Sequence, residues 1–168
     1  MPRFVVESRT LFALVVGGFV LLVLAPGAWS SNLRGQATVS SQEQNLLRSI
    51  NQARARHGAP PLRIASPLQR AARSHSQTML RTGNFTHGDW YRRLRRYGAN
   101  ARKLGETIAW GVGTDGTAAA IVRTWLASPP HRSTLLDRGF RYVGVGVAVG
   151  SFSGYGGASI ATADFGGR

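Results

Sequence analysis

Apolar residues recur at helical spacing in two stretches after the first forty positions. The first stretch runs from residue 40 to about 57, and Ser40 and Glu43 at its start are spaced as a capping box. Its apolar stripe consists of Leu46, Leu47, Ile50 and Ala53. The second stretch begins with Ser66 as the predicted N-cap and Pro67 in the first helical position, and it ends at a glycine. Both patterns predict amphipathic helices.

Two more helices and two strands follow. The segment "WYRRLRRYG", residues 90–98, leaves its arginines on a solvated face. Its apolar positions, at helical spacing, are Trp90, Leu94 and Tyr97. A fourth helix from about 117 to 126 should stop near Ser128, because the prolines that follow cannot continue its hydrogen bonds. The last segments, "RYVGVGVAVG" and "YGGASIATADFGG", are typical of two strands joined by a turn at residues 151–154. Helices followed by a hairpin predict an α+β fold, with helices packed on a small antiparallel sheet.

The first thirty residues have the pattern of an export signal. A polar start with two arginines precedes residues 11–24, which are all apolar or glycine, and small residues spaced as in a cleavage site follow. An uncleaved membrane anchor is the alternative, because the run with its flanks approaches the roughly 20 residues of a spanning helix. We favour a cleaved signal peptide at 1–30, a spacer at 31–39 and one domain at 40–168, located extracellularly or in the cell envelope.

Composition narrows the classes of partner and chemistry. The chain has no cysteine, which excludes disulfides, thiolate metal ligands and a cysteine nucleophile. Its 21 Lys and Arg against 7 Asp and Glu give a formal charge of +14, which attracts polyanions. For an exported protein we expect anionic lipid head groups or envelope polymers, and no nucleic acid, opposite the arginines of residues 92–96. We expect a monomer.

Few side chains could carry chemistry. Beyond residue 30 the histidines and glutamates are His57, His75, His87, His131, Glu43 and Glu106. The helix cap accounts for Glu43, and His57 lies at a helix end, where a cationic side chain is favoured. His75 falls on an apolar stripe, which is typical of a core histidine. Three residues remain, in predicted loops or at element ends where sites usually lie: His87, Glu106 and His131.

Spacing alone leaves the chemistry of these three residues open. Two imidazoles and a carboxylate suit zinc or another divalent cation, but they are 19 and 25 positions apart, so no short ligand motif supports a metal. A hydrolase triad would need Ser128 or Ser133 as nucleophile, and the chain lacks a G-x-S-x-G elbow. The segment "GVGTDG", residues 111–116, matches a dinucleotide fingerprint, but the following strand lacks the acid that binds the ribose. We interpret it as a loop.

Six segments in order carry a family resemblance: "INQARARHGAPPL", "LQRAARSHSQTM", "NFTHGDW", "GETIAWG", "TWLASPPHRSTLL" and "YVGVGVA". Together they resemble the CAP superfamily, also called SCP-like or cysteine-rich secretory, antigen 5 and pathogenesis-related 1 proteins, in its cysteine-free bacterial form. The resemblance spans about residues 44–166. It implies an α-β-α sandwich with a cleft lined by two His and two Glu, which in some members binds zinc or another divalent ion.

The resemblance places three of these residues on the family's cleft positions. They are His87, Glu106 and His131, and Ser128 stands where the second Glu would be, which weakens the case for proteolysis by paired acids. We therefore expect a non-catalytic exported protein that binds a small molecule, lipid, metal ion or envelope partner in this cleft, with His87 and His131 as metal ligands. The alternatives are a secreted protease or esterase using the same cleft, and a basic module that binds anionic polymers or lipids.

Overall fold

The structure is a computed structural model that describes residues 38–168. The predicted signal peptide or anchor at 1–30, and the spacer up to residue 37, lie outside the described residues. In the described part, no helix combines the length and apolarity needed to cross a bilayer.

The helices and strands, in chain order, are α1 (Ser41–Arg56), β1 (Arg63–Ile64), α2 (Ser66–Thr82), α3 (Trp90–Arg96), β2 (Lys103–Gly111), the 3-10 turn η1 (Gly113–Gly116), α4 (Ala118–Ala127), α5 (Pro129–Leu136), β3 (Phe140–Phe152) and β4 (Tyr155–Gly167). The four predicted helices and the two strands of the predicted hairpin are present in the predicted order, and β1, β2 and α5 are additional elements. Residues 111–116 end a strand and form a short turn, which agrees with their interpretation as a loop.

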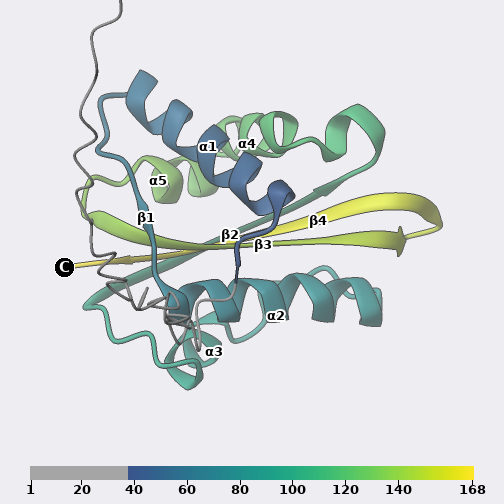
Figure 1. Cartoon of the computed structure of the whole chain (residues 1–168), viewed down its shortest axis with the longest axis horizontal. Coiled ribbons are helices and arrows are strands. Elements are labelled where there is room, and N and C mark those ends of the chain that lie inside the picture. The colour runs from purple at the N-terminus through teal and green to yellow at the C-terminus, as the bar shows by residue number, and fades with distance from the viewer. Residues whose placement is uncertain (1–37) are drawn as a thin grey trace, which may run out of the picture. The chain divides into compact units, whose positions relative to one another are not determined.

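The four strands form one sheet in the order β1-β3-β4-β2, so β2 is an edge strand. Helices α1, α4 and α5 lie over one face, and α2 and α3 lie over the other (Figure 1). This arrangement confirms the predicted α-β-α sandwich. The sheet is mixed rather than wholly antiparallel, because β1 pairs with β3 in parallel. Parallel strands cannot be joined by a tight hairpin, and the segment from α2 to α5 connects these two.

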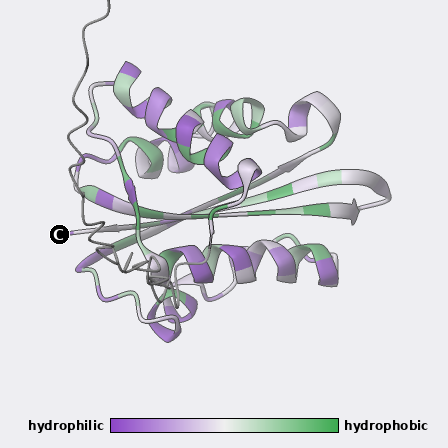
Figure 2. Cartoon of the chain, in the orientation of Figure 1, coloured by the Kyte–Doolittle hydropathy of each residue, from purple (hydrophilic) through white to green (hydrophobic). Residues whose placement is uncertain are grey.

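Two glycines on β3 decide how closely α2 approaches the sheet. A Cβ atom at Gly146 would overlap the carbonyl oxygen of Ala72, and one at Gly144 would overlap the carbonyl carbon of Leu68. The backbone of α2 therefore rests directly on the strand. On the opposite face, valines of the same strand enter the larger core around the fully buried Trp125. In Figure 2, hydrophobic positions alternate with pale or hydrophilic ones along the strands, α4 is largely hydrophobic, and α1 and α2 have mixed hydropathy.

The helix ends include two corrections to the sequence predictions. The N-cap of α2 is Ala65, so Ser66 and Pro67 are the first two helical residues, and no side chain caps this end. Helix α4 ends at Ala127, as predicted. The two prolines that follow do more than end this helix, because they are the first two residues of α5. Proline is tolerated there because the first N–H groups of a helix have no partner within the helix.

Candidate functional site

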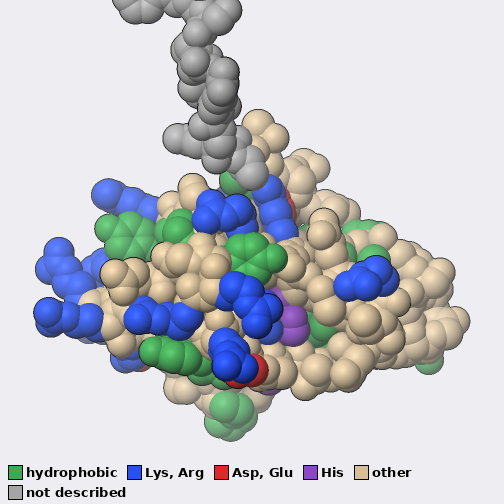
Figure 3. Space-filling view, turned by 90° about the horizontal axis from the view of Figure 1, so that it is seen from below, with side chains coloured by type: hydrophobic (Ala, Val, Ile, Leu, Met, Phe, Trp, Pro, Cys, Tyr) green, Lys and Arg blue, Asp and Glu red, His purple; other side chains and the backbone are tan. Residues whose placement is uncertain are grey.

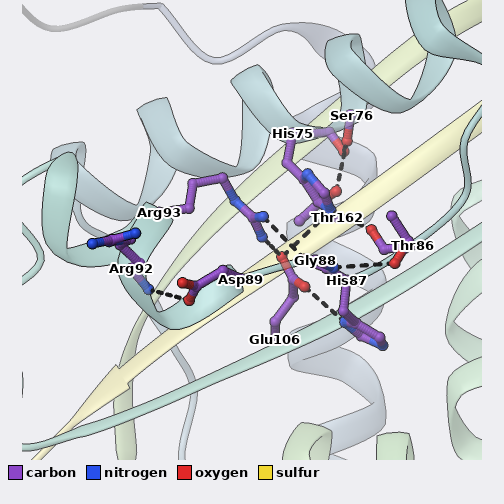
Figure 4. Close-up of polar contacts among 11 residues, drawn as sticks. His75, Ser76, Thr86, His87, Gly88, Asp89, Arg92, Arg93, Glu106 and Thr162 are labelled. Atoms are coloured by element: carbon purple, nitrogen blue, oxygen red, sulfur yellow. Dashed lines mark hydrogen bonds and ion pairs between the residues drawn. The ribbon is translucent and has the colours of Figure 1, made fainter.

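Glu106 lies in the middle of β2, not in a loop or at an element end as the sequence predicted. Its side chain is 1% exposed, and its carboxylate is engaged on both oxygens. His87 Nδ1 lies 2.7 Å from Oε1, and the guanidinium of Arg93 donates to Oε2. In Figure 4 the side chains of His87 and Arg93 reach this carboxylate from different sides. A buried carboxylate at the sheet edge is therefore the centre of the cluster.

Arg93 is a residue of the site that the sequence analysis assigned to the solvated face of its helix. That prediction is wrong for this arginine, because its side chain is only 15% exposed and pairs with Glu106. The reason is the orientation of α3, which starts where the side chain of Asp89 accepts the N–H of Arg92. Arg93 also donates from Nη1 to the carbonyl oxygen of His87 at 3.1 Å, so one side chain fixes both the loop and the carboxylate.

The contact with Glu106 determines which nitrogen of His87 is available. A carboxylate accepts, so Nδ1 carries the proton and the lone pair of the neutral ring is on Nε2. The ring centroids of His87 and His131 are 5.8 Å apart. His131 comes from the first turn of α5, in the other helical layer. The structure thus brings three predicted residues together across the edge of β2.

Ser128 is the fourth predicted cleft residue, and it lies at the junction of α4 and α5. In the described part of the chain its hydroxyl forms no hydrogen bond with a histidine or with Glu106. Burial, and secondarily the neighbouring His87, lowers the pKa of His131 below its usual value. His131 is therefore neutral at pH 7.

His75 is buried, as predicted for a core histidine, and its Nε2 donates to the carbonyl oxygen of Thr86 at 2.9 Å. The same nitrogen lies 3.9 Å from Oε2 of Glu106, so His75 also borders the site. Burial lowers its pKa, and the charge of Glu106 opposes that effect. The neighbouring Ser76 donates to Thr162 of β4 at 2.9 Å, which joins this turn of α2 to the sheet (Figure 4).

Asp164 is a second acid that the sequence analysis did not consider for the site. It is the cross-strand partner of Glu106, so both side chains lie on one face of the sheet. Asp164 is fully buried, and neither carboxyl oxygen has a hydrogen-bond partner among the described residues. Burial, followed by the charge of Glu106, raises the pKa of Asp164 well above its usual range. The only signal for it in the sequence is an acid on an otherwise apolar and small face of β4.

These side chains supply few ligands for a cation. His87 and His131 offer two imidazoles, and the described residues contain no group of three His, Cys, Asp or Glu side chains placed to hold a metal. Two imidazoles bound to one tetrahedral zinc ion, with zinc–nitrogen distances of about 2.0–2.1 Å, have ring centroids roughly 5–6 Å apart. The ring centroids of His87 and His131 are 5.8 Å apart. A cation bound by these two imidazoles would need water or a ligand in its remaining positions.

A family model and a protein of known sequence both match most of this chain. The model of the cysteine-rich secretory protein family, CAP, matches residues 47–165. The uncharacterized protein YkwD of Bacillus subtilis strain 168 is 30% identical over 115 residues, which cover 66% of this chain and 44% of that protein.

Two solved structures are similar to the described domain. An extracellular protein containing a SCP domain from Bacillus anthracis strain Ames has 27% identity and a TM-score of 0.62, over 74% of this chain and 40% of that one. An outer surface protein from Borrelia burgdorferi has 19% identity and a TM-score of 0.65, over 78% and 96% of the two chains, and supports the fold alone. This chain spans less than half the length of YkwD and of the Bacillus anthracis protein.

Proposed function

Since the chain belongs to the cysteine-rich secretory protein (CAP) family, we propose that it is an exported, non-catalytic binding domain. Its cleft, formed by His87, Glu106 and His131, takes a divalent cation together with a small ligand. Export is supported by the apolar segment at residues 11–24 and by the extracellular location of the Bacillus anthracis protein, which is 27% identical to this chain.

The contact of His87 with Glu106 carries this proposal. Because Nδ1 donates to the carboxylate, Nε2 is the nitrogen that can bind a cation, and a second neutral imidazole lies beside it. Carboxylate-bound histidines are the usual arrangement around protein-bound zinc. When bound, the cation would act as a Lewis acid that attracts an anionic or carbonyl oxygen of the ligand. His87 and His131 would hold it, and Glu106 would orient His87.

The same geometry favours binding over hydrolysis. A general base needs a free lone pair within reach of a water or a nucleophile. The carboxylate of Glu106 is buried and engaged on both oxygens, and the hydroxyl of Ser128 has no histidine partner among the described residues. A secreted protease or esterase using this cleft stays the alternative. It predicts turnover of a peptide or ester library that is lost in Glu106→Ala with the fold intact.

Calorimetric titration of the purified protein with Zn²⁺ tests the metal part. We expect binding at pH 7 that is abolished in His87→Ala/His131→Ala and weakened about 10- to 100-fold in Glu106→Gln, which removes the partner that orients His87. Binding should fade as the pH falls below about 6.5, because protonated imidazole is no ligand. His57→Ala is the matched control, since His57 is exposed at the end of α1. Absence of heat with the wild type, or equal heat in the double variant, refutes the metal site.

A further inference from the structure

A groove of about 820 Å³ lies beside β1, the start of α2, the start of β3 and the end of β4. It is separate from His87, Glu106 and His131, none of which lines it. This volume is within the roughly 300–1,000 Å³ of typical ligand pockets. We call it the arginine groove and define it by Arg63, Arg102, Arg141, Leu68, Tyr142 and Gly166.

Positive charge is the first feature of the arginine groove. Arg63, Arg102 and Arg141 are exposed, and none of them forms an ion pair with another described residue. The lining contains no aspartate or glutamate side chain. In Figure 3, Lys and Arg side chains gather over the end of the molecule that carries the C-terminus in Figure 1, with hydrophobic side chains between them. Arginine forks of this kind match the oxygens of phosphate and carboxylate groups.

An apolar floor is the second feature. Gly166 packs closely against the apolar side chains of the floor, because a Cβ atom there would lie 3.1 Å from Cδ1 of Leu68 and 3.4 Å from Cβ of Ala101. Three prolines contribute further apolar walls: Pro60, Pro61 and Pro67. At the rim, Tyr142 is 50% exposed and presents an apolar ring with a polar tip.

We propose that the arginine groove binds the head group of an anionic phospholipid displayed by a membrane. The phosphate lies among Arg63, Arg102 and Arg141, and the adjoining apolar part of the lipid lies over Leu68 and beside Tyr142. This inference is independent of the His87–Glu106 cleft and of any cation bound there.

The combination of features favours a phospholipid over a soluble polyanion. A sulfated or phosphorylated polymer would gain from the arginines but not from the apolar floor, and a neutral lipid would gain from the floor but not from the arginines. A molecule with a phosphate next to an apolar chain uses both. The N-terminus of α2 adds to the attraction, because no side chain caps it and it faces the groove through Ala65 and Pro67.

The test compares the affinity of the full chain for phosphatidylcholine vesicles with and without phosphatidylglycerol. Residues 1–37 are the same in every variant, so a difference between variants in the ratio of the two affinities reports the folded domain. Each arginine near an anionic surface contributes about 5-fold, so Arg63→Ser/Arg102→Ser/Arg141→Ser should reduce the preference for anionic vesicles ~100-fold. Tyr142→Ser, which keeps all charges, should reduce it about 5-fold.

The matched control removes three other exposed arginines, one each from α1, α2 and α4. None of them lines the groove or donates a side-chain hydrogen bond in the described part: Arg56, Arg81 and Arg123. This control variant has the same net charge as the groove variant, and its preference for anionic vesicles should fall by less than about 10-fold. Circular dichroism and urea unfolding verify that all variants fold.

Three results overturn the proposal. If the groove variant and the control lose the preference for anionic vesicles equally, the protein is attracted by its overall positive charge and not by the groove. An unchanged preference in the groove variant means that the lipid binds elsewhere. Binding of dextran sulfate that depends on the same arginines and displaces the protein from vesicles, with no effect of Tyr142→Ser, assigns the groove to a soluble polyanion instead.

Discussion

The clearest energetic consequence of the site concerns the acid pair behind it. Arg93 lies near two carboxyl groups, Glu106 and Asp164, and it needs only one negative charge as a partner. In the native protein Glu106 carries that charge, and the raised pKa of Asp164 keeps Asp164 protonated. We predict that the two acids can substitute for each other, so that Glu106→Gln and Asp164→Asn are strongly non-additive.

The magnitude follows from the burial of the groups. Breaking a buried ion pair on one side costs about 3–5 kcal/mol, because the other charge is left uncompensated. In Glu106→Gln burial still raises the pKa of Asp164, but the repulsion by Glu106 is gone and the charge of Arg93 lowers that pKa, so Asp164 should ionise more readily beside Arg93, and we expect a loss of only ~1–2 kcal/mol. Asp164→Asn leaves the Arg93–Glu106 pair intact and should change stability by less than about 1 kcal/mol. The double variant leaves Arg93 unpaired and should lose ~3–5 kcal/mol, a coupling of about 2 kcal/mol.

Urea unfolding of the four proteins at pH 7 measures this cycle. Asp115→Asn is the control in combination with Glu106→Gln, because Asp115 is exposed in η1 and should be additive within about 0.5 kcal/mol. A carboxyl carbon NMR titration adds an independent readout, since the pKa of Asp164 should fall in Glu106→Gln. If the two acid substitutions are additive, or if the pKa of Asp164 does not move, Asp164 is no reserve partner for Arg93.

Three further predictions concern the frame of the site. Gly146→Ala pushes a methyl group into the backbone of α2 and should cost about 1–3 kcal/mol, whereas Gly156→Ala, with open space around it, should change stability by less than about 0.5 kcal/mol; equal melting temperatures would contradict the packing account. Arg54→Met removes the donor that reaches three carbonyl oxygens at 2.6–3.1 Å, of which only that of Asp137 keeps a backbone donor, and should cost roughly 3 kcal/mol in urea unfolding. Burial lowers the pKa values of His75 and His131, so on these two groups the unfolded chain binds more protons below about pH 6.5, whereas the raised pKa of Asp164 acts in the opposite sense. In Asp164→Asn stability should therefore fall on acidification from pH 7 to 5, and a urea midpoint that stays flat in that variant would refute the effect of the two histidines.

For four helices and the hairpin of β3 and β4 the sequence was sufficient, because local signals and periodicity agreed, but it did not predict β1, β2 or α5. The capping box at Ser40 is present, with Glu43 accepting the N–H of Ser40 at 2.8 Å, and the hairpin strands lie where alternation predicted them. The start of α2 was off by one residue because Ser66 could serve equally as the N-cap or as the first helical residue. Such one-residue shifts depend on the backbone conformation of Ala65, which a pattern of residue types does not contain.

The site was predictable only in part, because its partners come from separate elements. Elimination selected His87, Glu106 and His131, since few other histidines and glutamates were available. It failed for Arg93, because an arginine among exposed arginines looks solvated until the orientation of α3 is known. It also failed for Asp164, which becomes part of the site only through the pairing of β4 with β2.

The position of the second acid affects what the cleft can do. A carboxylate at position 128 would add negative charge near His131, whereas Ser128 adds none. The acid at 164 is instead behind Glu106, without access to solvent, and is neutral while Glu106 is ionised. The charges of Glu106 and Arg93 cancel, so the local net charge is close to zero before a ligand arrives. A divalent cation held by His87 and His131 would therefore keep most of its charge, and that charge is what would attract an anionic ligand into the cleft.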